Sequence, residues 1–135
     1  MSERPSNPTK TIITTLNAKY IHTNLAIRLL YQLNKNRVEH LYWKEFTIKQ
    51  PIHDIINSLM DFDQVAFSCY IWNIIPILEC VKQLKQRNPR IRILLGGPEV
   101  SYDAESILNN NAVDAVCYDE GEQPFSEWIQ NCQPL

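Results

Sequence analysis

Five short apolar runs alternate with segments of helical character along the chain, and this alternation limits the fold more than any other feature. The runs lie at residues 11–16, 38–46, 65–69, 91–95 and 113–118. Helix signals follow them at 25–33, 51–59, 74–86, 101–108 and 123–131. Strands that alternate with helices favour a parallel sheet, because each parallel connection needs a crossover. We therefore expect a flavodoxin-like α/β fold with five strands in the order 2-1-3-4-5 and helices on both faces.

Individual helices and strands carry more specific expectations. In the first helix, the apolar residues with helical spacing are Leu25, Leu29, Leu30 and Leu33. Pro51 begins the second helix, and its inward-facing residues are expected to be Ile52, Ile55, Ile56 and Leu59. Asn73 stands where it could cap the third helix. The continuous apolar run at 65–69 suits a strand that is buried on both faces.

Bulk composition excludes several classes of protein. The length of 135 residues fits one domain with its own core, and we expect residues 1–10 to be a disordered tail before a single domain at 11–135. A net charge of −2 gives no electrostatic case for nucleic acid or an anionic membrane. Apolar stretches fall short of the ~20 residues of a membrane helix. The four cysteines lack metal or redox spacing, which fits a cytoplasmic location.

Glycine is scarce, and its placement indicates a site. Two of the three glycines, Gly96 and Gly97, follow the run at 91–95, and Gly121 follows the run at 113–118. Glycine serves where the backbone turns with positive φ or approaches a ligand closely. In a sheet of this type, ligands bind beyond the carboxyl ends of the strands. A tight turn alone would also explain Gly96-Gly97-Pro98.

The segments that follow the strands argue against three familiar ligands. A dinucleotide needs glycines after the first strand, and 17–22 has none. A flavin phosphate would need a small, hydroxyl-rich loop there, and a phosphorelay receiver an aspartate where Ser68 and Cys69 stand. What remains suits a large, flat, partly apolar ligand. It is a set of small residues beside aromatic ones, namely Ala18, Ser68, Gly96 and Gly97 with Tyr20, Tyr70 and Trp72.

Taken together, these segments resemble the amino-terminal cobalamin-binding domain of radical S-adenosylmethionine (SAM) enzymes. The branch it is most similar to is named after the anaerobic magnesium-protoporphyrin monomethyl ester cyclase. The resemblance covers residues 11–131. The matching stretches are Asn17-Ala18-Lys19-Tyr20-Ile21-His22, Phe67-Ser68-Cys69-Tyr70-Ile71-Trp72-Asn73, Leu95-Gly96-Gly97-Pro98-Glu99-Val100 and Gly121-Glu122.

The resemblance implies that cobalamin lies across the carboxyl ends of the strands. It assigns the following residues to the cofactor: Asn17, Ala18, Tyr20, His22, Ser68, Cys69, Tyr70, Gly96, Gly97, Pro98, Glu120 and Gly121. It also implies methyl transfer or related radical chemistry in a following barrel domain, which would hold SAM and a [4Fe-4S] cluster. The three-cysteine motif of that barrel is absent here, so this chain is expected to be non-catalytic alone. The parent would be a methyltransferase or an oxidative cyclase-like enzyme, with cobalamin and the barrel as partners; a homodimer is left open.

His22 stands in a segment that departs from the family pattern. Better-known cobalamin domains carry Asp-x-His-x-x-Gly there, and the histidine is the lower axial ligand of cobalt. This chain has Tyr20-x-His22-x-x-Leu25, so His22 lacks the carboxylate that would orient its ring. Three roles stay open for His22: cobalt ligand, corrin-packing residue, or structural residue of the loop.

Bland interpretations and other functions also stay open. Ser68 could be a buried hydroxyl bonded to backbone, and Glu120 could stabilise a helix amino terminus. The missing aspartate and glycine would also fit a docking domain that keeps the fold without a cofactor. A third hypothesis, an enzyme with Cys69 as nucleophile, lacks an evident histidine partner.

Overall fold

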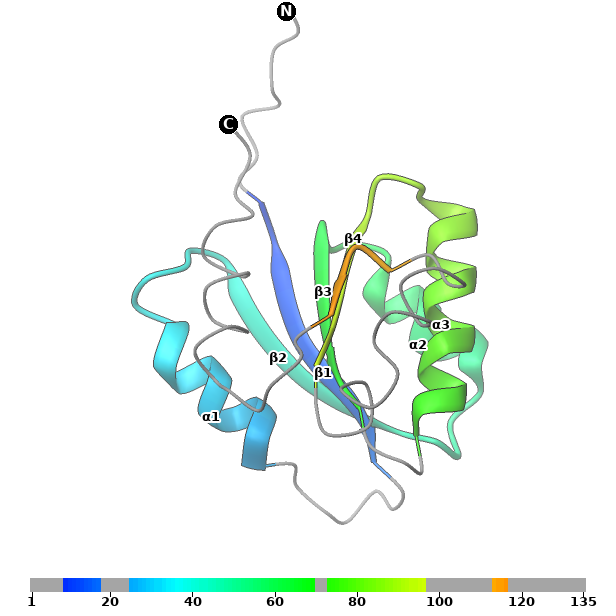
Figure 1. Ribbon diagram of the computed structural model, residues 1–135, viewed down its shortest axis with the longest axis horizontal. Helices are drawn as coiled ribbons and strands as arrows, with labels where there is room; N and C mark the ends of the chain where they lie inside the picture. The colour runs from blue at the N-terminus through cyan, green and yellow to red at the C-terminus, as the bar shows by residue number, and fades with distance from the viewer. Residues whose placement is uncertain (1–8, 18–24, 70–72, 97–112, 117–135) are drawn as a thin grey trace, which may run out of the picture.

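The computed structural model describes residues 9–17, 25–69, 73–96 and 113–116, which contain a parallel sheet and three α-helices (Figure 1). The strands are β1 (Thr11–Asn17), β2 (Leu41–Thr47), β3 (Gln64–Ser68), β4 (Arg92–Gly96) and β5 (Ala115–Val116). The helices are α1 (Leu25–Asn34), α2 (Ile52–Leu59) and α3 (Ile74–Arg87). The strand order is β2-β1-β3-β4-β5, and every pair is parallel. The predicted fold class and strand order are confirmed.

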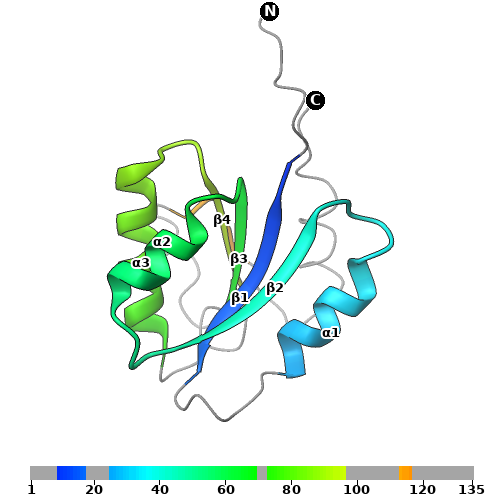
Figure 2. The ribbon, with the colours of Figure 1, turned by 180° about the vertical axis from the view of Figure 1, so that it is seen from behind.

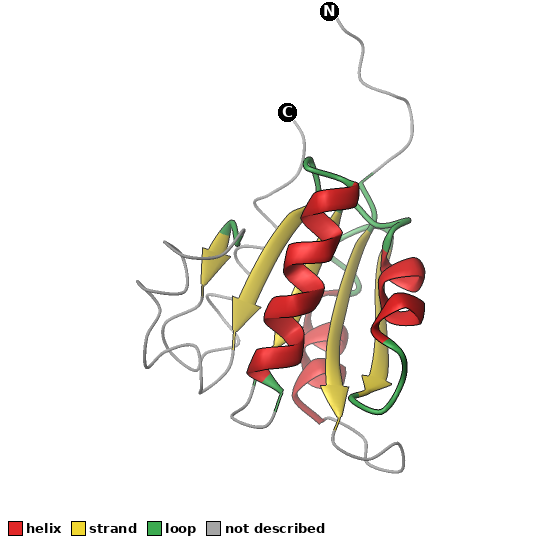
Figure 3. Cartoon of the chain, turned by 90° about the vertical axis from the view of Figure 1, so that its right-hand side faces the viewer, coloured by secondary structure: helices red, strands yellow, loops and turns green. Residues whose placement is uncertain are grey.

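Helices cover both faces of the sheet. Figure 2 shows α2 and α3 packed side by side against one face, while α1 lies on the other. Seen from the side in Figure 3, the strand arrows all point the same way, so their carboxyl ends share one edge. The helices expected at 101–108 and 123–131 lie outside the described residues.

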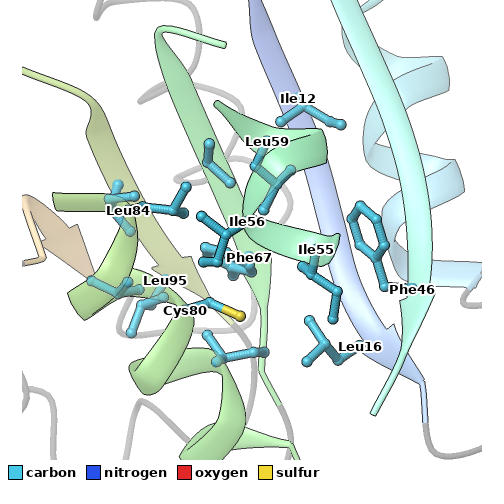
Figure 4. Packing of buried hydrophobic residues seen from close by; sticks show 14 of the residues in the cluster. Ile12, Leu16, Phe46, Ile55, Ile56, Leu59, Phe67, Cys80, Leu84 and Leu95 are labelled. Atoms are coloured by element: carbon cyan, nitrogen blue, oxygen red, sulfur yellow. The ribbon is translucent and has the colours of Figure 1, made fainter. Parts of the chain in front are cut away.

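The core is divided by the sheet into two clusters. The larger one lies between the sheet and the α2–α3 pair, where Ile56 and Leu84 meet Phe67 (Figure 4). The smaller one lies between the sheet and α1, around Ile13 and Ile27. Neighbouring side chains of a strand point to opposite faces, so a strand covered on both sides is buried along its whole length. All of β3 is buried, as predicted.

The second helix is built as the sequence predicts, whereas the first matches the prediction at Leu30 but not at Leu29 and Leu33. In α2, Ile55, Ile56 and Leu59 are buried, and Ile52 packs against the same cluster. In α1, the residues against the sheet are Ile27 and Leu30, whereas Leu29 and Leu33 are 44% and 49% exposed. Apolar residues lie on more than one face of this helix, so their spacing does not say which face meets the sheet.

The second strand starts later than predicted. The partial alternation of side chains at 38–46 predicts a strand from Val38, but β2 begins at Leu41. His40, just before it, has φ = 59°, which interrupts extended backbone. Its carbonyl accepts a hydrogen bond from the Thr11 amide at 3.0 Å, so this bend starts the β1–β2 ladder.

Asp114 attaches β5 to the sheet. Its main-chain N–H donates to the Ile93 carbonyl (2.9 Å), and its carboxylate Oδ2 accepts from the Ile93 N–H (2.7 Å). The same Oδ2 accepts from Lys85 Nζ at 2.9 Å. One side chain therefore joins β4, β5 and α3 at the amino-terminal edge of the sheet.

We expect Asp114→Ala to lower the free energy of unfolding by about 1–3 kcal/mol, since the Ile93 amide loses a charged acceptor. Urea unfolding followed by circular dichroism measures this loss. Asp61→Ala, at an exposed carboxylate between α2 and β3, is the control and should change stability by less than about 0.5 kcal/mol. Equal stabilities of the two variants would contradict this role of Asp114.

Candidate functional site

The edge where the strands end contains the point at which the chain order of the sheet reverses. β1 lies between β2 and β3, and α1 and α3, which follow β1 and β3 in the chain, lie on opposite faces of the sheet. In open α/β sheets, ligands bind beyond the strand ends at this strand-order reversal.

Ser68, Cys69 and Gly96 come together at this edge. Ser68 is the last residue of β3 and is in register with Gly96, the last residue of β4. The Cys69 amide donates to the Gly96 carbonyl at 2.7 Å, which extends the contact beyond the ladder. All three are buried. Because Gly96 has no Cβ and Ser68 has a short side chain, only small groups stand at the ends of these two central strands.

The ladder between β1 and β3 stops before either strand ends. The β1–β3 ladder runs from Thr11–Gln64 to Thr14–Phe67, whereas the β1–β2 ladder continues to Asn17–Thr47. The last three residues of β1 therefore continue the ladder with β2 beyond the end of the β1–β3 ladder.

A network of side-chain hydrogen bonds joins the end of β1 to the end of β3 and to the residue before α3. The Thr15 hydroxyl donates to the Ser68 carbonyl at 2.7 Å. Nδ2 of Asn73 donates to Thr15 Oγ1 (3.2 Å) and to the Leu16 carbonyl (2.9 Å). Thr15 and Asn73 are both fully buried. Buried polar groups of this kind stabilise a structure only when their partners are present.

The prediction that Asn73 caps α3 is confirmed for its position and wrong for its side chain. Asn73 does occupy the residue before α3, and its carbonyl accepts from the Ile77 amide at 2.9 Å. Its side chain, however, makes no capping hydrogen bond and reaches β1 instead. Sequence reasoning missed Asn73 and Thr15 as site residues. The available signal was the presence of polar residues inside apolar stretches, since buried polar groups need partners.

Asn17 lies at the same edge but is tied to the outer strand. Its Nδ2 donates to Glu45 Oε1 at 2.5 Å, and its carbonyl accepts from the Ile48 amide at 2.9 Å. The structure thus joins Asn17 to β2 and the residues after it. The other predicted site residues lie outside the described residues, namely Ala18, Tyr20, His22, Tyr70, Gly97, Pro98, Glu120 and Gly121.

The two cysteines of the described segments belong to the core. Cys69 is fully buried, and its thiol lies 3.9 Å from the Phe67 carbonyl as a weak donor. Burial raises the pKa of the Cys80 thiol to about 12, and the nearby Glu79 carboxylate adds to the shift. Cys80 is therefore a neutral thiol at physiological pH, unsuited to nucleophilic chemistry.

Neither a metal-ligand cluster nor a membrane-spanning helix occurs among the described residues. Within it, no group of three or more His, Cys, Asp or Glu side chains gathers in a way that could hold a metal ion. None of its helices has the length and apolar character to span a bilayer.

Comparison with known proteins gives a family match over most of the chain. Residues 11–129 match the family model described as B12 binding domain. A cobalamin-dependent radical SAM methyltransferase, TokK of Streptomyces tokunonensis, is 30% identical over 80 residues. The 2-(S-pantetheinyl)-carbapenam-3-carboxylate methyltransferase of Streptantibioticus cattleyicolor is 29% identical over 79 residues. Each alignment covers 58% of this chain and 12% of the relative, so the chain matches a small part of each methyltransferase.

A solved structure supports the fold alone. A protein of Burkholderia pseudomallei, described as pilus assembly-related, superimposes with a TM-score of 0.61. The match covers 90% of this chain and 87% of that one at 11% sequence identity. Such low identity carries the architecture and not the function.

Proposed function

The chain belongs to the B12-binding domain family, and on this premise we propose that it binds cobalamin at the carboxyl ends of β1, β3 and β4. We further propose that it serves as the cobalamin-binding module of a radical SAM protein. Bound cobalamin would carry a methyl group, or support related radical chemistry, for a separate barrel domain that holds SAM and a [4Fe-4S] cluster. This chain's own residues would bind and orient the cofactor.

The observation that carries the proposal is the set of small residues at the ends of two neighbouring strands. Gly96 and Ser68 end β4 and β3 in register, and the β1–β3 ladder beside them stops at Thr14–Phe67. The missing Cβ of Gly96 leaves room that any larger residue would fill. These residues fit a bulky cofactor whose tail must approach the backbone closely.

The family relatives support the larger context. Both are methyltransferases, and one is described as cobalamin-dependent and radical SAM. The matched segment amounts to 12% of either relative, so most of the length of those proteins lies outside the match. We propose the same division of labour here, with residues 11–135 forming the cobalamin domain.

Titration of the chain with hydroxocobalamin tests the proposal. We expect binding at micromolar concentrations. Calorimetry and changes in the visible spectrum of the cofactor measure it. Gly96→Val should lower the affinity by about tenfold or more, since overpacking typically costs 1–3 kcal/mol and each 1.4 kcal/mol is a factor of ten. The same titration on His22→Ala reports whether that side chain ligates cobalt, because loss of an axial ligand changes the spectrum.

Ala115→Val is the matched control for Gly96→Val. It also adds bulk to a strand, but on β5, where Ala115 pairs with Leu94 and not with the end of β4. Circular dichroism must show both variants folded. A folded wild-type chain that ignores hydroxocobalamin would contradict the proposal and would favour a docking domain without a cofactor.

A further inference from the structure

We propose that Thr15 and Asn73 are positioning residues for cobalamin, holding the ends of β1 and β3 at the separation that the cofactor requires. This inference rests on the proposed function and adds two residues that the sequence motifs did not assign. Neither side chain needs to touch the cofactor for this role.

Hydrogen bonds continue past the point where the β1–β3 ladder stops. Up to Thr14–Phe67, backbone hydrogen bonds set the distance between β1 and β3. Beyond that pair, the Ser68 carbonyl accepts from the Thr15 hydroxyl, and the Leu16 carbonyl accepts from Asn73. Side-chain hydrogen bonds from Thr15 and Asn73 therefore continue beyond the last ladder pair, at the carboxyl ends of the strands.

Asn73 connects α3 to β1, and through Thr15 it is also linked to β3. Its carbonyl takes part in the first turn of α3, while its amide holds Thr15 and Leu16 on β1. Thr15 in turn holds the Ser68 carbonyl at the end of β3. Segments 18–24 and 70–72, which contain predicted cofactor residues, follow β1 and precede Asn73 in the sequence. The network therefore involves described residues that lie close to both segments in the sequence.

A fully buried, hydrogen-bonded network restricts how far the two strands can move apart. Two donors on Nδ2 and one hydroxyl satisfy three buried acceptors, and each bond has a fixed direction. A site held in its binding geometry before the ligand arrives loses less freedom on binding. Weakening the network should therefore lower the affinity even while the chain remains folded.

Thr15→Val tests the inference, because valine keeps the shape of threonine and removes the hydroxyl. The matched control is Thr14→Val, at a neighbouring buried threonine whose hydroxyl donates to the Lys44 carbonyl on β2 at 2.6 Å. We expect Thr15→Val to raise the Kd for hydroxocobalamin by about tenfold. Thr15→Ser should keep the Kd within about twofold, since the hydroxyl remains, and Thr14→Val should leave it unchanged.

The Kd for hydroxocobalamin distinguishes a role in positioning the binding site from a role in stability alone. Urea curves first establish that each variant is folded under the binding conditions. If the network were only structural, Thr15→Val and Thr14→Val would both lose stability and both keep the wild-type Kd, which would overturn the inference. If Thr15→Val does not fold, Asn73→Ser replaces it and should raise the Kd similarly; an unchanged Kd there would also overturn the inference. Failure of the wild-type chain to bind would instead overturn the proposed function.

Discussion

Asn73→Asp is expected to lower the free energy of unfolding by about 2–4 kcal/mol at neutral pH, although it keeps the shape of the side chain. In the structure, Nδ2 of Asn73 donates to Thr15 Oγ1 and to the Leu16 carbonyl, and the residue is fully buried. A carboxylate has no donor to offer, so its negative charge would face these two oxygens. Leaving buried polar groups unpaired costs about 1–3 kcal/mol each, and more for a charge.

The loss should depend on pH in a defined direction. Burial and the two facing oxygens would raise the pKa of the introduced carboxyl in the folded state above its unfolded value of about 3.9. The folded state then binds more protons, so stability falls as the pH rises from about 4 through the raised pKa. Urea unfolding between pH 4 and pH 8 measures this trend relative to the wild type.

Asn36→Asp is the control, because it makes the same chemical change at an exposed position between α1 and β2. Its stability relative to the wild type should stay within about 0.5 kcal/mol across the same pH range. If Asn73→Asp were as stable as this control at pH 8, Asn73 could not hold the ends of β1 and α3 through its amide.

Ile56→Ala should lower the free energy of unfolding by about 2–5 kcal/mol, which is the range for removing a large aliphatic side chain from a packed core. Ile56 is fully buried at the centre of the cluster between the sheet and the α2–α3 pair (Figure 4). Alanine would leave a cavity that the neighbouring Phe67 and Leu84 could fill only in part. Thermal or urea unfolding gives the loss directly.

Ile75→Ala provides the comparison, since Ile75 in α3 is 74% exposed and the substitution is otherwise identical. We expect a change of less than about 0.5 kcal/mol, because an exposed side chain leaves no cavity and alanine favours helix. A similar loss in both variants would mean that the described core is not the one that stabilises the chain.

The experiments separate folding from binding. Ile56 and Asp114 act on the stability of the sheet and its helices, away from the edge where β3 and β4 end. Gly96 and Thr15 act at that edge and are expected to change the affinity for cobalamin. Asn73 belongs to both groups, because its amide holds a strand while its carbonyl takes part in the first turn of a helix.

The amino-acid sequence determined the fold class through local patterns. Apolar runs such as 65–69 and helical spacing such as that of Ile52, Ile55 and Ile56 follow from backbone geometry, which repeats every two or 3.6 residues. Such patterns do not depend on distant residues, so the sequence alone reveals them. The alternation of strands and helices then predicted the strand order correctly. The small residues Ser68 and Gly96 were likewise visible at the ends of apolar runs.

Only the tertiary structure decided which partners the polar side chains choose and which helix stripe meets the sheet. Asn73 and Thr15 are 58 residues apart, and the nearby first turn of α3 was the expected partner for the Asn73 amide. Leu29 and Leu33 follow helical spacing as well as any core residues, yet they remain half exposed. A polar side chain with several possible hydrogen-bond partners pairs with the buried groups that need a partner. Those groups come together only when distant segments of the chain have packed.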